Sequence, residues 1–230
     1  MTDMSKYVTK ERYYPPYVPP KRYEGWPLEE IQKDKLKDSV APLVWSKTVD
    51  ALAELKELLA KYTDFQRLCL IYRMLADNVR YDDPIIPSSY QYVSVIKRRG
   101  GVCCSISDLL FLMCDACFDS AKIYQVSGKV ITDGAEDFGH AWNMVQLKEG
   151  TFFLDVTADL GKTSWKWFLV GSEQVRKDRS WEKEGHPIPQ KKNYSGNCYS
   201  DPEMSGKLAE WFTRLGPRFE RSVYRLCKDV

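Results

Sequence analysis

Apolar residues in the first half of the chain recur at steps of three and four positions, the spacing that places them on one face of an α-helix. The predicted helices cover 28–37, 46–59, 64–79 and 103–118. Pro42 interrupts the first pattern, and we expect Ser46 and Asp64 to cap the second and third helices with their side-chain oxygens. A loop rich in proline, serine and tyrosine is expected over 82–94. The segment 103–118 is apolar on nearly every side, which predicts a buried, central helix.

After residue 120 the pattern changes to alternation and to β-branched and aromatic residues, which favour strands. The predicted strands cover 123–131, 139–147, 151–157 and 165–170. Because most of the links between them are short, we expect an antiparallel sheet. A helix-rich first half and a strand-rich second half predict the α+β class, with the helical half packed on the sheet. One or two helical turns are expected over 172–178, and a last helical stretch is expected to open at Pro202 and to break at Pro217.

Composition divides the chain into three parts. Residues 1–27 are rich in tyrosine and proline, which favours an extended arm that lies on the domain or projects from it, with a partner-binding or site-covering segment as the alternative. Residues 28–178 form the expected core domain. Residues 179–230 form a C-terminal extension whose terminal helix is expected to pack on that core.

Charge and hydropathy exclude several kinds of partner. Thirty-four basic and thirty-two acidic residues give a net charge of +2, so we expect neither nucleic acid nor an anionic membrane surface as a partner. The N-terminus lacks the apolar stretch of a signal peptide, and no apolar run approaches the ~20 residues of a membrane span, which predicts a cytoplasmic protein. A protein or peptide substrate is the expected partner, and the oligomeric state stays open.

The seven cysteines are odd in number, and without a secretion signal reduced thiols are expected. Most of them lie in or beside apolar helical runs, where a free cysteine behaves as a small apolar side chain. Cys103 differs because it stands where the Gly100-Gly101 turn enters the helix over 103–118. There the helix macrodipole favours the thiolate, which is the reactive form of a nucleophilic cysteine.

Two further residues complete a catalytic set. His140 lies in a strand-like run, and Asp155 lies in the next one. In a thiol acyl-transfer enzyme, Cys103 would attack a carbonyl carbon, His140 would transfer protons, and Asp155 would orient and stabilise the imidazolium. The Cys103 N–H is one expected oxyanion donor.

A second oxyanion donor or substrate contact cannot be chosen by pattern. The candidates are Tyr90, Tyr92 and Trp142. No cofactor or metal is expected.

The register of the hairpin between the two strands decides whether His140 and Asp155 lie on the same face of the sheet. If Lys148 and Glu149 form a two-residue turn, the numbers of facing residues add to 297, and Asp155 lies one diagonal step from His140 on the same face of the sheet. A three-residue loop with a bulge at Gly150 would place the two on opposite faces unless a second bulge compensates.

These residues carry a resemblance to a known family. The blocks are Gly101-Val102-Cys103 with Asp108-Leu109-Leu110, His140-Ala141-Trp142-Asn143, and Leu154-Asp155-Val156-Thr157. In order and compact spacing they resemble the signature blocks of the transglutaminase-like superfamily, over about residues 64 to 175. The resemblance implies a papain-like core and a Cys-His-Asp triad on Cys103, His140 and Asp155. It also places the nucleophile two residues after a glycine, which selects Cys103 over Cys104.

The family includes cross-linking enzymes, peptidases, amidases and domains without activity, so the resemblance leaves the reaction open. We favour hydrolysis, because transamidation needs a second site for an amine and protection from water. A catalytically silent interaction module is the main competing interpretation. A zinc site or a dithiol redox pair would instead draw on Cys103, Cys104, Cys114 and Cys117. A helical setting suits neither, since thiolate zinc sites normally use turns and adjacent cysteines form strained disulfides.

Overall fold

The structure, a computed structural model, describes residues 24–132 and 137–226, with side chains described as far as residue 220. The predicted arm over 1–27 therefore lies almost wholly outside the described residues.

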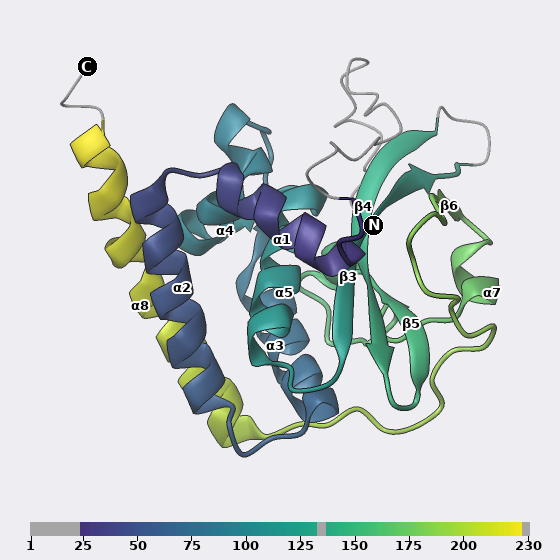
Figure 1. Cartoon of the computed structure of the whole chain (residues 1–230). Coiled ribbons are helices and arrows are strands. Elements are labelled where there is room, and N and C mark those ends of the chain that lie inside the picture. The colour runs from purple at the N-terminus through teal and green to yellow at the C-terminus, as the bar shows by residue number, and fades with distance from the viewer. Residues whose placement is uncertain (1–23, 133–136, 227–230) are drawn as a thin grey trace.

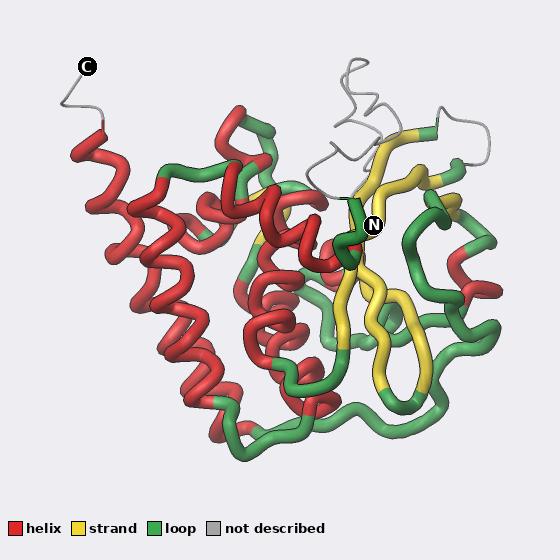
Figure 2. The backbone as a smooth tube through the Cα atoms, in the orientation of Figure 1, coloured by secondary structure: helices red, strands yellow, loops and turns green. Residues whose placement is uncertain are grey.

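Helices gather on one side of the molecule and an antiparallel sheet on the other, with α5 between them (Figures 1 and 2). The helices are α1 (Leu28–Asp38), α2 (Pro42–Leu58), α3 (Asp64–Asn78), η3 (a 3₁₀ helix, Pro87–Tyr90), α4 (Tyr92–Arg98), α5 (Cys103–Cys117), α6 (Val156–Asp159), α7 (Ser172–Val175) and α8 (Pro202–Leu226). The predicted α+β class is confirmed.

The main sheet has the strand order β5-β4-β3-β6, with antiparallel neighbours. Its strands are β3 (Lys122–Val130), β4 (Phe138–Leu147), β5 (Gly150–Leu154) and β6 (Arg179–Trp181). A separate parallel pair joins β1 (Arg80–Tyr81) to β2 (Gly100–Gly101).

One predicted strand is wrong. Residues 165–170 add only an isolated bridge between Val170 and Phe153. Leu169 has a φ of 51°, which a strand does not accommodate. The fourth strand is instead β6, just beyond the predicted domain boundary at residue 178, so the core sheet continues into the C-terminal part.

Several predicted helix limits are also wrong. Helix α2 begins at Pro42 rather than Ser46, because a proline fits the first turn, where no intrahelical N–H bond is lost. Thr63, not Asp64, caps α3, in a capping box with Gln66. The expected loop over 82–94 contains η3 and the start of α4.

Helix α8 passes through Pro217 without ending. An interior proline costs about 3 kcal/mol, but Leu215 and Phe219 are both buried, and burying such side chains stabilises by about 1.5–3 kcal/mol each. The helix packs on α2, α3 and α4, as expected for the C-terminal extension.

The core surrounds α5, as its all-round apolar pattern predicted. Leu109, Leu110, Phe111 and Leu112 all lie buried in the larger apolar cluster. The sheet has a second, smaller apolar cluster, which includes Trp142 and several aromatic and aliphatic residues from 124 to 175. Both faces of the sheet are thus covered. In the described part of the chain, none of the helices combines the length and the apolar character that crossing a bilayer requires.

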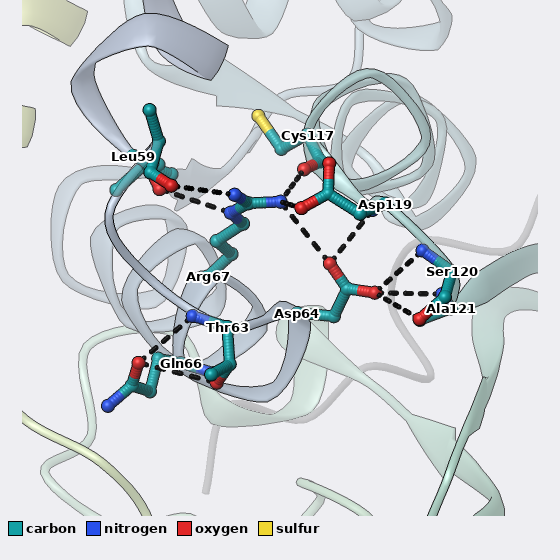
Figure 3. A network of polar contacts seen from close by, with 10 residues as sticks. Leu59, Thr63, Asp64, Gln66, Arg67, Cys117, Asp119, Ser120 and Ala121 are labelled. Carbon is teal, nitrogen blue, oxygen red and sulfur yellow. Dashed lines mark hydrogen bonds and ion pairs between the residues drawn. The ribbon is translucent and has the colours of Figure 1, made fainter.

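A polar network ties the far end of α5 to the turn before α3 (Figure 3). The buried Arg67 guanidinium donates to the carbonyls of Leu59, Ala60 and Cys117 at 2.6–3.1 Å. Asp64 accepts from three successive backbone N–H groups that start at Asp119. The network satisfies the free carbonyls of two helix ends, which fixes the turns that follow them.

Candidate active site

Cys103 is the first residue of α5, and the chain before it is held in place by side chains. The Asp82 carboxylate accepts a hydrogen bond from Ser89 and forms an ion pair with Arg98, both at 2.5 Å. A side chain at Gly100 would collide with this carboxylate. The glycine turn and its carboxylate therefore fix the direction from which the chain enters the helix.

Of the two hairpin geometries that the sequence left open, the structure has the two-residue turn. Leu147 faces Gly150 at the turn and Asn143 faces Leu154, so the paired residue numbers add to 297. His140 and Asp155 meet on one side of the sheet, with 2.8 Å between His140 Nε2 and Asp155 Oδ2.

Asp155 follows β5 directly and also begins α6. Its Oδ1 accepts a 3.1 Å hydrogen bond from the Ala158 N–H as the N-cap of α6, while Oδ2 faces His140. The Asp155 N–H donates to the Trp167 carbonyl, and its own carbonyl accepts from the Tyr72 hydroxyl at 3.0 Å. The carboxylate, which is only 2% exposed, thus caps a helix and binds the imidazole at once.

His140 Nδ1 is the ring nitrogen left for the Cys103 thiol, since Asp155 engages Nε2. Nδ1 makes no hydrogen bond of strict geometry with any described residue, yet the imidazole lies close enough to the thiol to interact with it. Burial opposes the thiolate, but the hydrogen bond and charge of His140 and the Ala141 N–H outweigh it, so the pKa of Cys103 is lowered. This environment favours a thiolate.

The imidazole is affected in the complementary direction. Burial opposes its charged form, but the Asp155 carboxylate, followed by Cys103, outweighs burial and raises the pKa of His140 to about 10. The electrostatics favour an imidazolium paired with a thiolate, the resting state of an activated cysteine.

Arg179, which the sequence pattern did not single out, completes the contacts of Asp155. Its Nη2 lies 2.8 Å from Asp155 Oδ2, and its guanidinium lies 3.4 Å from the centroid of the Trp167 ring. Burial raises the pKa of Asp155, but the charges of His140 and Arg179 outweigh it and hold that pKa below its usual value. Arg179 stands at the start of a polar stretch, and only the pairing of β6 with β3 brings it to the site.

Tyr81 is a second residue that the pattern did not assign to the site. Its pairing with Gly101 in the β1–β2 ladder brings it beside Cys103, where its hydroxyl interacts with the Cys103 thiol and accepts a hydrogen bond from the Cys103 N–H. Burial and a negative charge at Cys103 raise the pKa of Tyr81, so its hydroxyl keeps the proton that it can donate. A parallel pair of two-residue strands leaves no periodic signal by which the sequence could have placed it.

The predicted substrate contacts fare differently. Trp142 is 1% exposed and stacks on the His140 ring at 5.6 Å, so it supports the imidazole from within the core. Tyr92 is also 1% exposed, and its hydroxyl pairs with Thr48 at 3.1 Å. Because both side chains are buried, neither Trp142 nor Tyr92 is in a position to contact a substrate. Tyr90 is half-buried at the end of η3.

The other described cysteines differ from Cys103 in electrostatics. Burial raises the pKa of Cys104, and it raises the pKa of Cys117 to about 12. Cys114 is fully buried, and its pKa is raised as well. Among the described residues, no group of three or more His, Cys, Asp or Glu side chains is placed to hold a metal ion.

Two hollows on the described surface lie away from these residues. One is lined by residues from the start of α3, the α5–β3 turn and the β4–β5 turn, and the other by residues from 188–195 with Glu149 and Phe152. Neither includes Cys103, His140 or Asp155. These hollows are therefore not where the triad would meet a substrate.

Searches of protein-family models and of curated proteins found no match to this chain.

Proposed function

We propose that the protein catalyses thiol-dependent acyl transfer at peptide or carboxamide bonds, with Cys103 as nucleophile. The observation that carries the proposal is the joint placement of three groups. Cys103 begins a buried helix, the imidazole of His140 interacts with its thiol, and Asp155 Oδ2 lies 2.8 Å from His140 Nε2.

The residues divide the steps as follows. The Cys103 thiolate attacks the carbonyl carbon, and a C–S bond forms while the carbonyl oxygen becomes an oxyanion. The imidazolium of His140 gives its Nδ1 proton to the leaving amine as the C–N bond breaks, which leaves a thioester and a neutral imidazole. His140 then takes a proton from water, the hydroxide attacks the thioester, and the C–S bond breaks to restore the thiolate. Asp155 holds the Nε2–H throughout.

The oxyanion needs hydrogen-bond donors at the attacked carbon. The Cys103 N–H is one, at the N-terminus of α5, and Tyr81 is the second in this proposal because its hydroxyl already lies on that N–H. In the absence of substrate the hydroxyl occupies this position, and an acyl oxygen would take its place on the N–H and accept from Tyr81.

A papain-like, transglutaminase-like core is part of the proposal. It is supported by a nucleophile at the N-terminus of α5, by the packing of that helix on β3 and β4, and by a histidine on one antiparallel strand with an aspartate directly after the next. Within this reaction class we favour hydrolysis, because transamidation needs a second site for an amine and protection from water.

The arrangement of Cys103, His140 and Asp155 also fits one other candidate function, a silent interaction module that keeps the fold without turnover. Alkylation by iodoacetamide, followed across pH by mass spectrometry at every cysteine, separates the two. An activated site predicts that Cys103 reacts rapidly well below pH ~8.5, with Cys104 slow in the same molecule, and that His140→Ala removes the advantage. Equal, slow reaction of Cys103 and Cys198 would rule out the enzyme.

A further inference from the structure

Without Arg179, the charges of the three groups in the buried site would not sum to zero. A thiolate at Cys103, an imidazolium at His140 and a carboxylate at Asp155 together carry one net negative charge. Unbalanced charge is costly in the interior, where water does not screen it. Arg179, 7% exposed, adds the positive charge that brings the four groups to neutrality.

The placement of Arg179 is specific to the triad. Its Nη2 approaches Asp155 Oδ2, the oxygen that also faces His140, and not Oδ1, which the Ala158 N–H occupies. The guanidinium carbon lies over the Trp167 ring, 3.4 Å from its centroid, and 5.8 Å from the centroid of the Trp142 ring, which in turn stacks on His140.

Two features indicate that this arginine is held for its charge at Asp155. Its Nε is a buried donor without a partner, a cost that a purely structural arginine would avoid by further hydrogen bonds. In addition, β6, the strand that carries Arg179, lies close against β3 at Gly128. A side chain at Gly128 would collide with the Ser180 carbonyl of β6 and with the Trp142 ring. The fold thus keeps Arg179 at Asp155 although its hydrogen bonding stays incomplete.

We propose that Arg179 is a positioning residue that shares Asp155 with His140, keeps the carboxylate ionised, and sets the pH range in which the thiolate and imidazolium coexist. The part of this inference that concerns Cys103 rests on the proposed function, and the part that concerns His140 does not.

Several titratable groups face Asp155 from the elements packed around it. These are His140 from β4, Cys103 from α5, Arg179 from β6, Tyr72 from α3 and Asp159 from α6. Arg179 is the permanent cation among them. Removing it therefore leaves His140 and Cys103 in a more negative environment, which disfavours loss of a proton from either.

The first test reads His140 directly, by NMR titration of its imidazole in a Cys103→Ala background. The chain has only two histidines, so His186 serves as the internal reference. Arg179→Gln is expected to raise the pKa of His140 by about one unit, and Arg179→Lys, which keeps the charge, by less than half of that. Arg176→Gln is the matched control, because it removes an exposed arginine near β6 and is expected to change nothing.

The second test uses the chain with Cys103 intact. The acid limb of Cys103 alkylation is expected to move upward by about one pH unit in Arg179→Gln, so that the thiol reacts about tenfold more slowly below the midpoint. A structural role alone would lower the melting temperature of Arg179→Gln and leave both titrations of the folded protein unmoved.

The outcomes separate the two proposals. Superimposable His140 titrations with and without Arg179 would overturn the role of Arg179, whatever the activity. If Arg179→Gln does not fold, Arg179→Lys decides, and a full-unit shift there would show that charge is not what matters. An unactivated Cys103 in the unmodified protein, with His140 still responding to Arg179, would instead overturn only the proposed function.

Discussion

Among the described residues, two buried arginines pair with aspartates, and their surroundings differ in opposite ways. Arg67, 4% exposed, donates to three main-chain carbonyls as well as to Asp64 and Asp119 (Figure 3). Arg179 makes its ion pair with Asp155, rests on an aromatic ring and leaves Nε without a partner. Arg67 has hydrogen-bond partners on every side, whereas Arg179 makes its ion pair with the single oxygen Oδ2 of Asp155.

The contrast extends to what each pair holds. The Arg67 network joins helix ends, and none of the catalytic candidates touches it. The Arg179 pair touches Asp155, which faces His140. In this molecule the fully bonded arginine joins helix ends, and the incompletely bonded one supplies charge beside Asp155, the carboxylate of the proposed triad.

The largest expected effect is the loss of stability when Arg67, the structural arginine of the two, is replaced. Arg67→Met removes a buried donor from three main-chain carbonyls and the positive charge beside Asp64, and it is expected to lower the free energy of unfolding by about 3–5 kcal/mol. Urea denaturation measures this loss. Cys103 in the molecules that remain folded should be alkylated at the unmodified rate.

The matched control is Arg218→Met, which removes an arginine whose side chain is 39% exposed and pairs with Glu54. Exposed pairs contribute about 0–1 kcal/mol, so this variant should lose far less stability than Arg67→Met. Equal losses in the two variants would contradict the structural role assigned to the Arg67 network.

The sequence predicted what local periodicity encodes. The all-round apolar pattern indicated a central helix at 103–118, and the alternation on both sides of Lys148 and Glu149 indicated the hairpin and limited its register to two alternatives, one of which places His140 and Asp155 on one face. Residue type and position at a helix start singled out the Cys103-Cys104 pair, and the family resemblance selected Cys103. These are features that a few neighbouring residues determine.

The remainder depends on contacts between distant segments. Pro42 and Pro217 mislead a local prediction, because tertiary packing decides whether a proline starts, breaks or continues a helix. Arg179 and Tyr81 reach the site through strand pairs of two or three residues, too short to show a period. The contacts that adjust the triad were thus the part that the sequence could not predict.

A smaller effect is expected at Tyr81, on the catalytic side. Tyr81→Phe removes the hydroxyl beside the Cys103 N–H and is expected to lower kcat about 100-fold, the usual cost of losing one oxyanion donor. This prediction rests on the proposed function, and turnover of a fluorogenic peptide amide by the unmodified protein and by the variant measures it. Tyr92→Phe is the control, since its hydroxyl pairs with Thr48 away from the triad, and it should lose about 1 kcal/mol of stability and no activity. A Tyr81→Phe enzyme as active as Tyr92→Phe would remove Tyr81 from the mechanism.

The smallest effect sharpens the comparison through the pH dependence of stability. In Cys103→Ala, Asp155 still raises the pKa of His140 above the ~6.5 of an unfolded histidine. The folded state then keeps a proton that the unfolded state loses, so this contribution to stability is complete below pH ~6.5 and declines as the pH rises towards the folded pKa. We expect urea denaturation to show a loss of about 1 kcal/mol between pH 6 and 8, and none in Cys103→Ala/His140→Gln. Arg67→Met should lower stability equally at both pH values, since its network gains no proton over this range. A pH slope that survives in the double variant would show that His140 does not hold the proton that the site requires.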